Sequence, residues 1–213
     1  MVAVTNKALL QRVSEEKVVA IIRGQDVEAA VNSARVLFES GIEILEIALT
    51  LKGAFEAIER VAAIAPASCL VGAGTVITEK DVIASLRAGA QFMVTPSITP
   101  AVNYAAGQDI GVLSGAYTPT EVQQALELGV AAVKLFPAAA LGPQYVKALL
   151  DPFPYAAIIP VGGVTLELAK EYLAVGAIAV GAGGPLLGDA AHPGGDLDAL
   201  RDRARAFVKQ TSL

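Results

Sequence analysis

Eight short apolar runs recur along the chain, and each is followed by an amphipathic stretch with the period of a helix. Continuous apolar runs of this length are typical of parallel strands that are buried on both faces. The alternation therefore predicts repeated βα units, preceded by an extra helix over roughly residues 5–16. The runs lie at residues 18–23, 44–49, 70–75, 92–97, 111–116, 131–136, 156–162 and 178–183.

Capping residues indicate where the helices begin and end. Four side chains that can accept a hydrogen bond from a free helix N–H stand directly before helical stretches: Asp26, Thr78, Thr118 and Thr165. Four glycines stand just before the next strand, where the end of a helix favours a positive φ: Gly41, Gly89, Gly129 and Gly176. Residues 188–198 are expected to form a loop before the last helix.

Eight parallel strands that alternate with helices close most naturally into a (β/α)8 barrel, the TIM-barrel fold of the α/β class. An open doubly wound sheet is the alternative. It would leave hydrophobic edge strands, and it usually carries a glycine-rich motif after its first strand, where this chain reads Arg23-Gly24-Gln25-Asp26. No linker interrupts the sequence pattern, so residues 1–213 are predicted to form a single (β/α)8 domain with an extra N-terminal helix.

Composition narrows the classes of partner. Hydrophobic residues make up 54% of the chain, but no apolar stretch reaches the roughly 18 to 20 residues of a spanning helix. The net charge of −5 and the lack of a basic patch argue against nucleic acid. Cys69 is the only cysteine, and the first residues lack the apolar segment of a signal peptide. We therefore expect a cytoplasmic protein with small-molecule partners and with neither nucleic acid nor membrane as a partner.

Lys134 lies inside the apolar run at residues 131–136. Burying an ammonium group is unfavourable by several kcal/mol unless the charge is paired or neutralised, so folding alone does not explain this lysine. A lysine in an apolar site loses its proton more readily, and the free amine can attack a carbonyl to form a Schiff base. Two structural alternatives remain: the side chain reaches solvent from the strand end, or a structural carboxylate pairs with it.

The alternation of side chains along the strands brings other polar residues toward Lys134. Glu46 is expected to point into the barrel, and the same count places Ala73 with Thr75, and Phe136 with Lys134, on interior faces. A purely structural ion pair is the alternative for Glu46. Polar residues lie in the middle or at the C-terminal ends of their strands, where barrel active sites form: Arg23, Glu46, Thr75, Thr95 and Lys134.

Two glycine clusters follow the last two strands, at residues 162–163 and 181–184. Glycines let backbone N–H groups approach a phosphate, and barrels often bind phosphate between these strands, so we predict an anion site there. Tight turns are the alternative use. His192 is the only histidine and is expected to be a solvated loop residue. Because a metal site needs several clustered ligands, we predict no metal and no cofactor.

Several motifs, in this order, resemble the aldolases that act on 2-keto-3-deoxy-6-phosphogluconate (KDPG) and 4-hydroxy-2-oxoglutarate (KHG). The resemblance covers roughly residues 8–210. Its most specific segments are Gly-Ala-Gly-Thr at residues 72–75 and Lys-Leu-Phe-Pro at residues 134–137. It implies a class I aldolase on a (β/α)8 barrel, without a metal and typically a homotrimer, that forms pyruvate and an aldehyde such as glyceraldehyde 3-phosphate from a keto-deoxy sugar acid.

The resemblance also implies roles for single residues. Lys134 would form the Schiff base, and Glu46 would be the general acid/base. The pyruvyl part of the substrate would lie against Arg23, Thr75 and Pro96, with Arg23 near its carboxylate. We also expect Thr95 and Phe136 to contact the substrate. Backbone groups would bind the phosphate at Gly162, Gly163, Gly183 and Gly184.

The chain departs from common members of that family at two positions that bear on the substrate. Val161 stands where threonine is frequent, and Gly184 stands where serine is frequent. These departures leave the substrate open between KDPG and 2-keto-3-deoxy-6-phosphogalactonate, whose aldolases share much of the pattern. Two other hypotheses are a phosphate-binding barrel isomerase that forms no covalent intermediate and an assembly barrel without catalysis.

Overall fold

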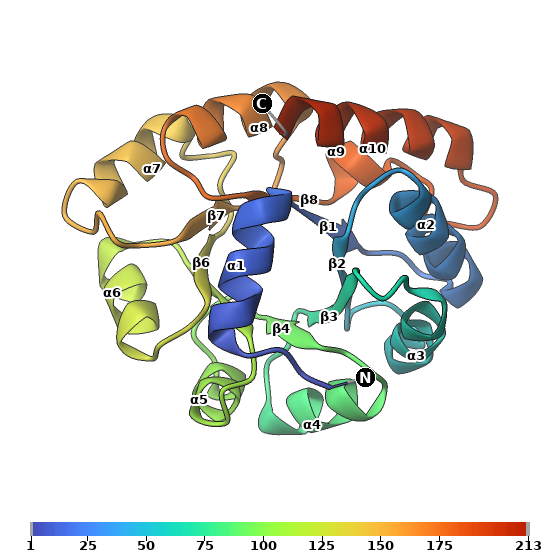
Figure 1. Ribbon diagram of the computed structural model, residues 1–213, viewed down its shortest axis with the longest axis horizontal. Helices are drawn as coiled ribbons and strands as arrows, with labels where there is room; N and C mark the ends of the chain where they lie inside the picture. Colours follow the sequence, from blue (N-terminus) through green and yellow to red (C-terminus); the bar gives the residue numbers. More distant parts are fainter. Residues whose placement is uncertain (1, 212–213) are drawn as a thin grey trace.

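Each of the eight apolar runs forms a strand of one parallel sheet in the computed structural model, which describes residues 2–211 (Figure 1). Consecutive strands pair from β1 to β7, and β1 also pairs with β8. The last seam is closed by a bond from the Ile178 N–H to the Ile158 oxygen at 3.0 Å and by a bridge between Val161 and Gly181. The strands are β1 (Val18–Ile22), β2 (Ile44–Ala48), β3 (Leu70–Gly74), β4 (Phe92–Val94), β5 (Val112–Ala116), β6 (Ala132–Leu135), β7 (Ile158–Pro160) and β8 (Val180–Ala182).

The barrel prediction is therefore confirmed, and the open doubly wound sheet is wrong. Helices surround the strands: α1 (Asn6–Glu16), α2 (Val27–Glu39), α3 (Ala54–Ile64), α4 (Glu79–Arg87), α5 (Pro100–Gly107), α6 (Pro119–Glu127), α7 (Pro143–Leu150), α8 (Leu166–Ala174), α9 (Gly184–Leu187) and α10 (Leu197–Thr211). None of the helices within residues 2–211 has both the length and the apolar character needed to cross a bilayer.

The predicted helix boundaries are largely confirmed. Side-chain oxygens of Asp26, Thr78, Thr118 and Thr165 each accept a hydrogen bond from the first turn of the following helix. The four glycines expected before strands all have positive φ, between 70° and 104°. The stretch at residues 188–198 is a loop as far as α10, which begins at Leu197. The short helix α9 was not predicted, because four residues are too few to show a helical period.

The strands are buried on both faces, which explains why the runs are continuously apolar. One face packs against the helices, with residues such as Leu45, Ile47 and Val133. The other face fills the barrel with Ile21, Ile44, Leu70, Phe92, Leu113 and Ile159. Branched and aromatic side chains in layers of this kind make the barrel interior a packed core rather than a channel.

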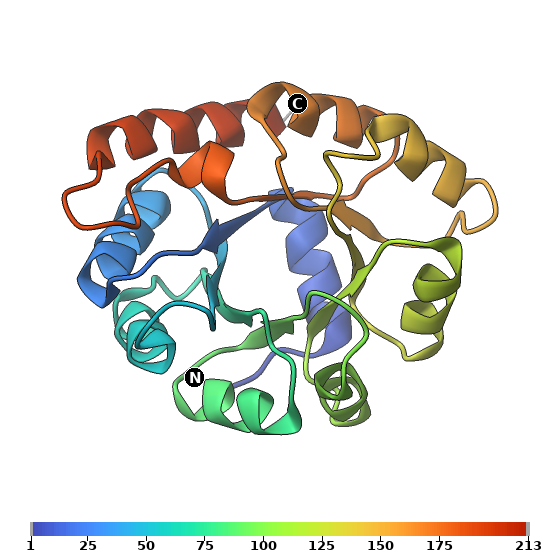
Figure 2. The same ribbon diagram turned by 180° about the vertical axis from the view of Figure 1, so that it is seen from behind.

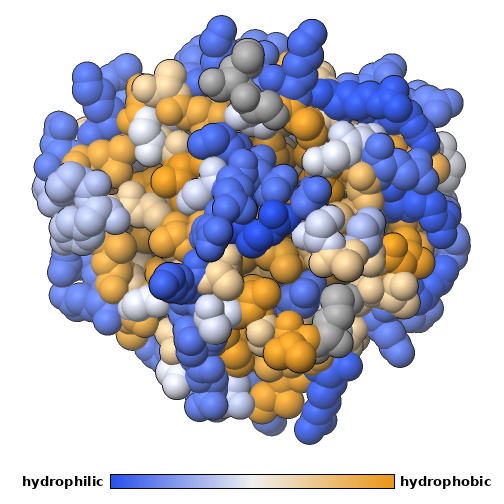
Figure 3. Space-filling model, in the orientation of Figure 1, coloured by the Kyte–Doolittle hydropathy of each residue, from blue (hydrophilic) through white to orange (hydrophobic). Residues whose placement is uncertain are grey.

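Helix α1 covers the end of the barrel at which the strands begin (Figure 1). Leu9 and Val13 are both 0% exposed and belong to the interior core. Backbone bonds fix the preceding segment, because Val4 donates to the Gln91 oxygen and accepts from the Gly111 N–H. Hydrophilic side chains cover the middle of this face, where α1 turns its polar side outward (Figure 3). Seen from the opposite side, α1 lies behind the ring of strands (Figure 2).

One prediction about side-chain direction is wrong. Ala73 was expected inside the barrel together with Thr75, but Ala73 packs with the helix layer. Gly72 and Gly74 face the interior instead, because a Cβ on Gly72 would overlap the ring of Phe92. Thr75 has a φ of 59°, so the regular alternation of side chains ends at this residue. Its side chain therefore does not point toward the helix layer as that of Ala73 does.

Candidate active site

Lys134 and Glu46 meet inside the barrel from opposite walls. Lys134 is on β6 and Glu46 is on β2, four strands away around an eight-stranded sheet. The Lys134 Nζ lies 3.7 Å from the Glu46 Oε1, and the two side chains are 6% and 2% exposed. The alternative in which Lys134 reaches solvent is therefore wrong. The pair by itself fits a structural ion pair as well as a reactive one, so its surroundings decide what it can do.

Burial dominates the acid–base behaviour of Glu46. It raises the pKa of this carboxyl group, and the positive charges of Lys134 and Arg23 oppose the shift without cancelling it. Within the described residues, the Glu46 Oε2 has no hydrogen-bond partner. Buried polar atoms without a partner are uncommon, and a catalytic role is one of the explanations for them. A carboxyl group with a raised pKa and a free oxygen is suited to take up and return a proton.

Apolar side chains surround the pair. Lys134 and Glu46 face a small cavity that is also lined by Val19, Ile21, Val94, Leu113, Ile159, Val161 and Gly181. The ring of Phe136 has its centre 5.5 Å from the Lys134 Nζ, within the range of a cation–π contact. A wall of this composition excludes water and strengthens the electrostatic interactions inside it.

Arg23 and Thr75 lie together at the mouth of the barrel, above the buried pair. Arg23 is exposed, and its Nη2 lies 3.5 Å from the Thr75 hydroxyl oxygen. The positive φ of Thr75 is uncommon for a β-branched residue, and backbone strain of this kind is concentrated at binding sites. An arginine here presents a planar set of donors that matches a carboxylate.

Thr95 is fully buried, and its hydroxyl is engaged with the backbone. The Thr95 Oγ1 donates to the Ser97 oxygen at 2.7 Å and accepts from the Gly115 N–H at 3.3 Å. These bonds hold the turn that contains Pro96 against Gly115, which is in register with Lys134. Pro96 is partly exposed beside the site. A direct contact of Thr95 or Pro96 with substrate stays a prediction.

The two glycine clusters lie side by side, because the bridge between Val161 and Gly181 joins their strands. Gly162 and Gly163 have φ values of 99° and 73°. The N–H group of Gly163 has no backbone acceptor within residues 2–211. Gly183 and Gly184 stand at the start of α9. This geometry leaves donors available for an anion, and the phosphate site stays a prediction.

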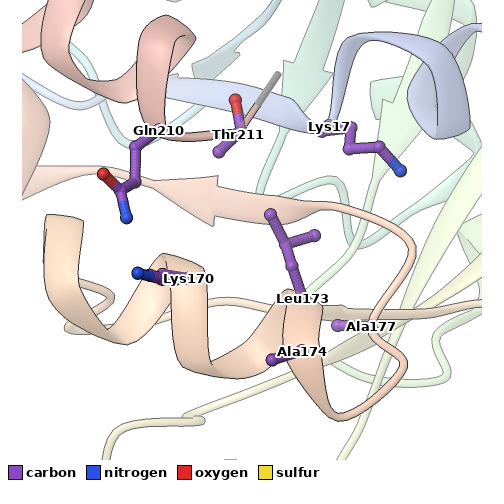
Figure 4. A pocket seen from close by; sticks show the side chains of 7 residues that line it. All are labelled: Lys17, Lys170, Leu173, Ala174, Ala177, Gln210 and Thr211. Atoms are coloured by element: carbon purple, nitrogen blue, oxygen red, sulfur yellow. The ribbon is translucent and has the colours of Figure 1, made fainter. Parts of the chain in front are cut away.

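Other parts of the molecule offer less chemistry. A groove on the outside of the barrel lies between α8 and the end of α10, with two lysines, Lys17 and Lys170, on its rim (Figure 4). It is at the end where the strands begin, opposite to the buried pair, and no carboxylate lines it. In the described part of the chain, no group of three or more His, Cys, Asp or Glu side chains is placed to hold a metal ion. His192 is exposed in the loop after α9.

The structure adds residues that the sequence did not single out. Leu113 and Ile159 form apolar walls of the cavity. Both could have been found from the sequence, because both are interior residues of the two strands that pair with the strand of Lys134. Gly74 lies against the Glu46 carboxyl group, which its place in the Gly-Ala-Gly-Thr segment does not reveal. Val161 lines the cavity without offering a hydroxyl.

Known proteins resemble this chain over most of its length. Residues 9–202 match the family described as KDPG and KHG aldolase. A protein from Rhizobium meliloti named "Probable 2-dehydro-3-deoxy-6-phosphogalactonate aldolase" is 36% identical, over 91% of each chain. A 2-dehydro-3-deoxy-phosphogluconate aldolase from Haemophilus influenzae is 33% identical over 80% of this chain and 81% of its own. The KDPG aldolase from Legionella pneumophila, with pyruvate captured as a covalent carbinolamine intermediate, is 28% identical, with a TM-score of 0.79 over 95% of this chain and 96% of its own.

Proposed function

The chain belongs to the KDPG and KHG aldolase family, and from this membership we propose that it cleaves a phosphorylated 2-keto-3-deoxy sugar acid through an imine on Lys134. The observation that carries the proposal is the buried pair, with the Lys134 Nζ 3.7 Å from the Glu46 carboxylate. A relative in which pyruvate was captured as a carbinolamine supports the covalent route. The products are pyruvate and an aldehyde such as glyceraldehyde 3-phosphate.

Imine formation begins with transfer of a proton from the Lys134 ammonium to Glu46. The raised pKa of Glu46 makes its carboxylate the stronger base that this transfer needs. The free amine then adds to the C2 ketone and gives a carbinolamine. Glu46 returns the proton to the C2 hydroxyl, water leaves, and a protonated imine remains. The apolar wall around the amine keeps water away from this intermediate.

Carbon–carbon cleavage follows from the positive charge on the imine. Glu46, directly or through a water molecule, removes the proton of the C4 hydroxyl. The C3–C4 bond breaks, its electron pair moves into the imine to form an enamine, and the C4 oxygen becomes the carbonyl of the released aldehyde. Protonation of the enamine at C3 and hydrolysis of the imine release pyruvate and restore the amine.

The carboxylate end and the phosphate end of the substrate need different groups of hydrogen-bond donors. Arg23 and Thr75, which lie 3.5 Å apart at the mouth, are suited to the carboxylate of the pyruvyl part. Phe136 and Pro96 would border the same part. Backbone N–H groups at Gly162 and Gly163, with those of Gly183 and Gly184 at the start of α9, would bind the phosphate.

A second candidate substrate is 2-keto-3-deoxy-6-phosphogalactonate, which differs from KDPG in the configuration at C4. Two observations favour it: the 36% identical relative carries that name, and Val161 offers no hydroxyl inside the cavity. Cleavage rates on the two substrates, and on their unphosphorylated forms, would choose between them and test the phosphate site. We also propose that the protein is cytoplasmic and that it forms a homotrimer, as the family resemblance implies. Light scattering would test the trimer.

Borohydride reduction in the presence of pyruvate tests the covalent route directly. We expect a mass gain of one reduced pyruvyl group, located on Lys134 by peptide mapping. Lys134→Ala should lose both the adduct and cleavage, whereas a change of the exposed Lys147 to Ala is a matched control that should keep both. An unlabelled Lys134 in an active enzyme would exclude the imine and favour a non-covalent isomerase-type site. Absence of both activity and adduct would favour an assembly barrel.

A further inference from the structure

We infer that Gly74 is a positioning residue for the Glu46 carboxyl group: the missing side chain of Gly74 is the space in which that carboxyl group lies. The inference rests on the proposed function, because it assigns a kinetic role through Glu46. A Cβ built on Gly74 would lie 2.8 Å from the Glu46 Cδ and 2.9 Å from each of its carboxylate oxygens. Contact with all three atoms at once means that the carboxyl group lies flat against the Cα of Gly74.

The strand register explains this contact. Glu46 is in register with Gly72, whereas Gly74 is in register with Ala48, two residues nearer the mouth. The Glu46 side chain therefore leans along its strand and crosses to the neighbouring strand at Gly74. A straighter path is not open, because the ring of Phe92 occupies the space beside Gly72.

The backbone at Gly74 does not itself require glycine. Gly74 is an ordinary residue of β3, and its φ lies outside the left-handed range that favours glycine. Its Cα faces the barrel interior, and every residue of β3 is buried. The absence of a side chain is therefore the property that matters at this position, and the structure provides one use for it, which is room for a carboxyl group.

Few other contacts fix the carboxyl group. The Oε2 has no hydrogen-bond partner among residues 2–211, and the Oε1 faces Lys134 at 3.7 Å, longer than a hydrogen bond. Packing against Gly74 thus decides how far the carboxyl group reaches across the barrel. A displacement of about 1 Å in a reacting group can lower a rate by about 10²-fold. We expect Gly74→Ala to lower kcat for cleavage by about 10- to 10²-fold, with KM changed by less than about 2-fold.

A double-mutant cycle separates this role from a general loss of structure. If Gly74 acts through Glu46, Gly74→Ala should lower kcat strongly in the wild type but by less than about 2-fold in a Glu46→Gln background. Gly107→Ala is the control, because a Cβ there meets nothing within 4 Å. An equal loss in both backgrounds, or an unchanged kcat in Gly74→Ala, would overturn the inference.

A stability cycle covers the case in which Gly74→Ala folds poorly. Truncation in Glu46→Ala removes the group that the new Cβ would meet, so the double variant Glu46→Ala, Gly74→Ala should regain the melting temperature of Glu46→Ala alone. A double variant that melts as early as Gly74→Ala would refute the contact. This cycle needs no turnover, so its result stands even if wild-type protein forms no adduct and the proposed function fails.

Discussion

Replacing Lys134 with methionine should make the stability of the protein strongly dependent on pH. Methionine keeps the length and most of the volume of the lysine stem, so it leaves no large cavity. It removes the cation that lies 3.7 Å from the Glu46 Oε1. Glu46 is then a fully buried carboxyl group whose nearest remaining positive charge is Arg23 at the exposed mouth.

The sign follows from the pKa of Glu46, which burial already raises in the folded wild type. A carboxyl group with a higher pKa in the folded state than in the unfolded chain binds more protons when folded, so the free energy of unfolding falls as pH rises between the two values. Loss of Lys134 removes an interaction that lowers this pKa and therefore extends the window upward.

The magnitude can be estimated from the same argument. Each pH unit inside the window lowers the free energy of unfolding by about 1.4 kcal/mol. A window that is longer by two pH units gives about 2.7 kcal/mol. This value is close to the lower end of the roughly 3–5 kcal/mol that removal of one partner from a buried ion pair costs.

Urea denaturation followed by circular dichroism at pH 5, 6, 7 and 8 would measure the effect. The midpoint of Lys134→Met should fall with pH more steeply than that of the wild type, and the double variant Lys134→Met, Glu46→Gln should lose the extra slope. Lys147→Met, at an exposed position, is the matched control and should follow the wild type. Parallel pH profiles for Lys134→Met and the wild type would refute a coupled buried pair.

Three further substitutions test other parts of the site. Glu46→Gln should lower kcat by about 10²- to 10⁴-fold in steady-state cleavage assays, because it removes the proposed proton carrier. A kcat near that of the wild type would exclude this role. Arg23→Ala should raise KM for the keto acid about 10-fold, because one charge-assisted hydrogen bond is lost at an exposed position, and Arg23→Lys should recover part of this loss. An unchanged KM in Arg23→Ala would place the substrate carboxylate elsewhere. Gly115→Ala should destabilise the fold by about 1–3 kcal/mol or more, since the new Cβ would overlap the backbone of Pro96. Thermal melting of this variant, with Gly107→Ala as the control, would measure the loss of stability. Equal melting temperatures would contradict the packing of Gly115 against Pro96.

The sequence was sufficient for the barrel and for the main pair because both depend on regular patterns. Runs buried on two faces predict parallel strands, and strict alternation along β2 and β6 turns Glu46 and Lys134 inward. Alternation fails where the backbone leaves the regular strand. The φ of 59° at Thr75 separates this residue from Ala73, and no property of the local sequence reports that angle.

Tertiary contacts set the remaining features. The hydroxyl of Thr95 is used by the Gly115 N–H, twenty residues away in the chain, so its bonding depends on how β4 and β5 come together. The contact between Gly74 and the Glu46 carboxyl group depends on the register of two strands and on the direction of a long side chain. These contacts join residues that are distant in the chain, so they could not be predicted from the local sequence around either residue.

The helix at the base of the barrel closes the end where the strands begin to molecules that approach Lys134. Leu9 and Val13 fill the end where the strands begin, so both fragments of a cleaved substrate exit through the same opening. In the proposed reaction, the aldehyde fragment lies between solvent and the three-carbon fragment that is still attached to the lysine, and it must depart first. Product inhibition should accordingly be asymmetric: pyruvate competes with intact substrate for the empty enzyme, whereas the aldehyde re-enters only on top of the attached fragment.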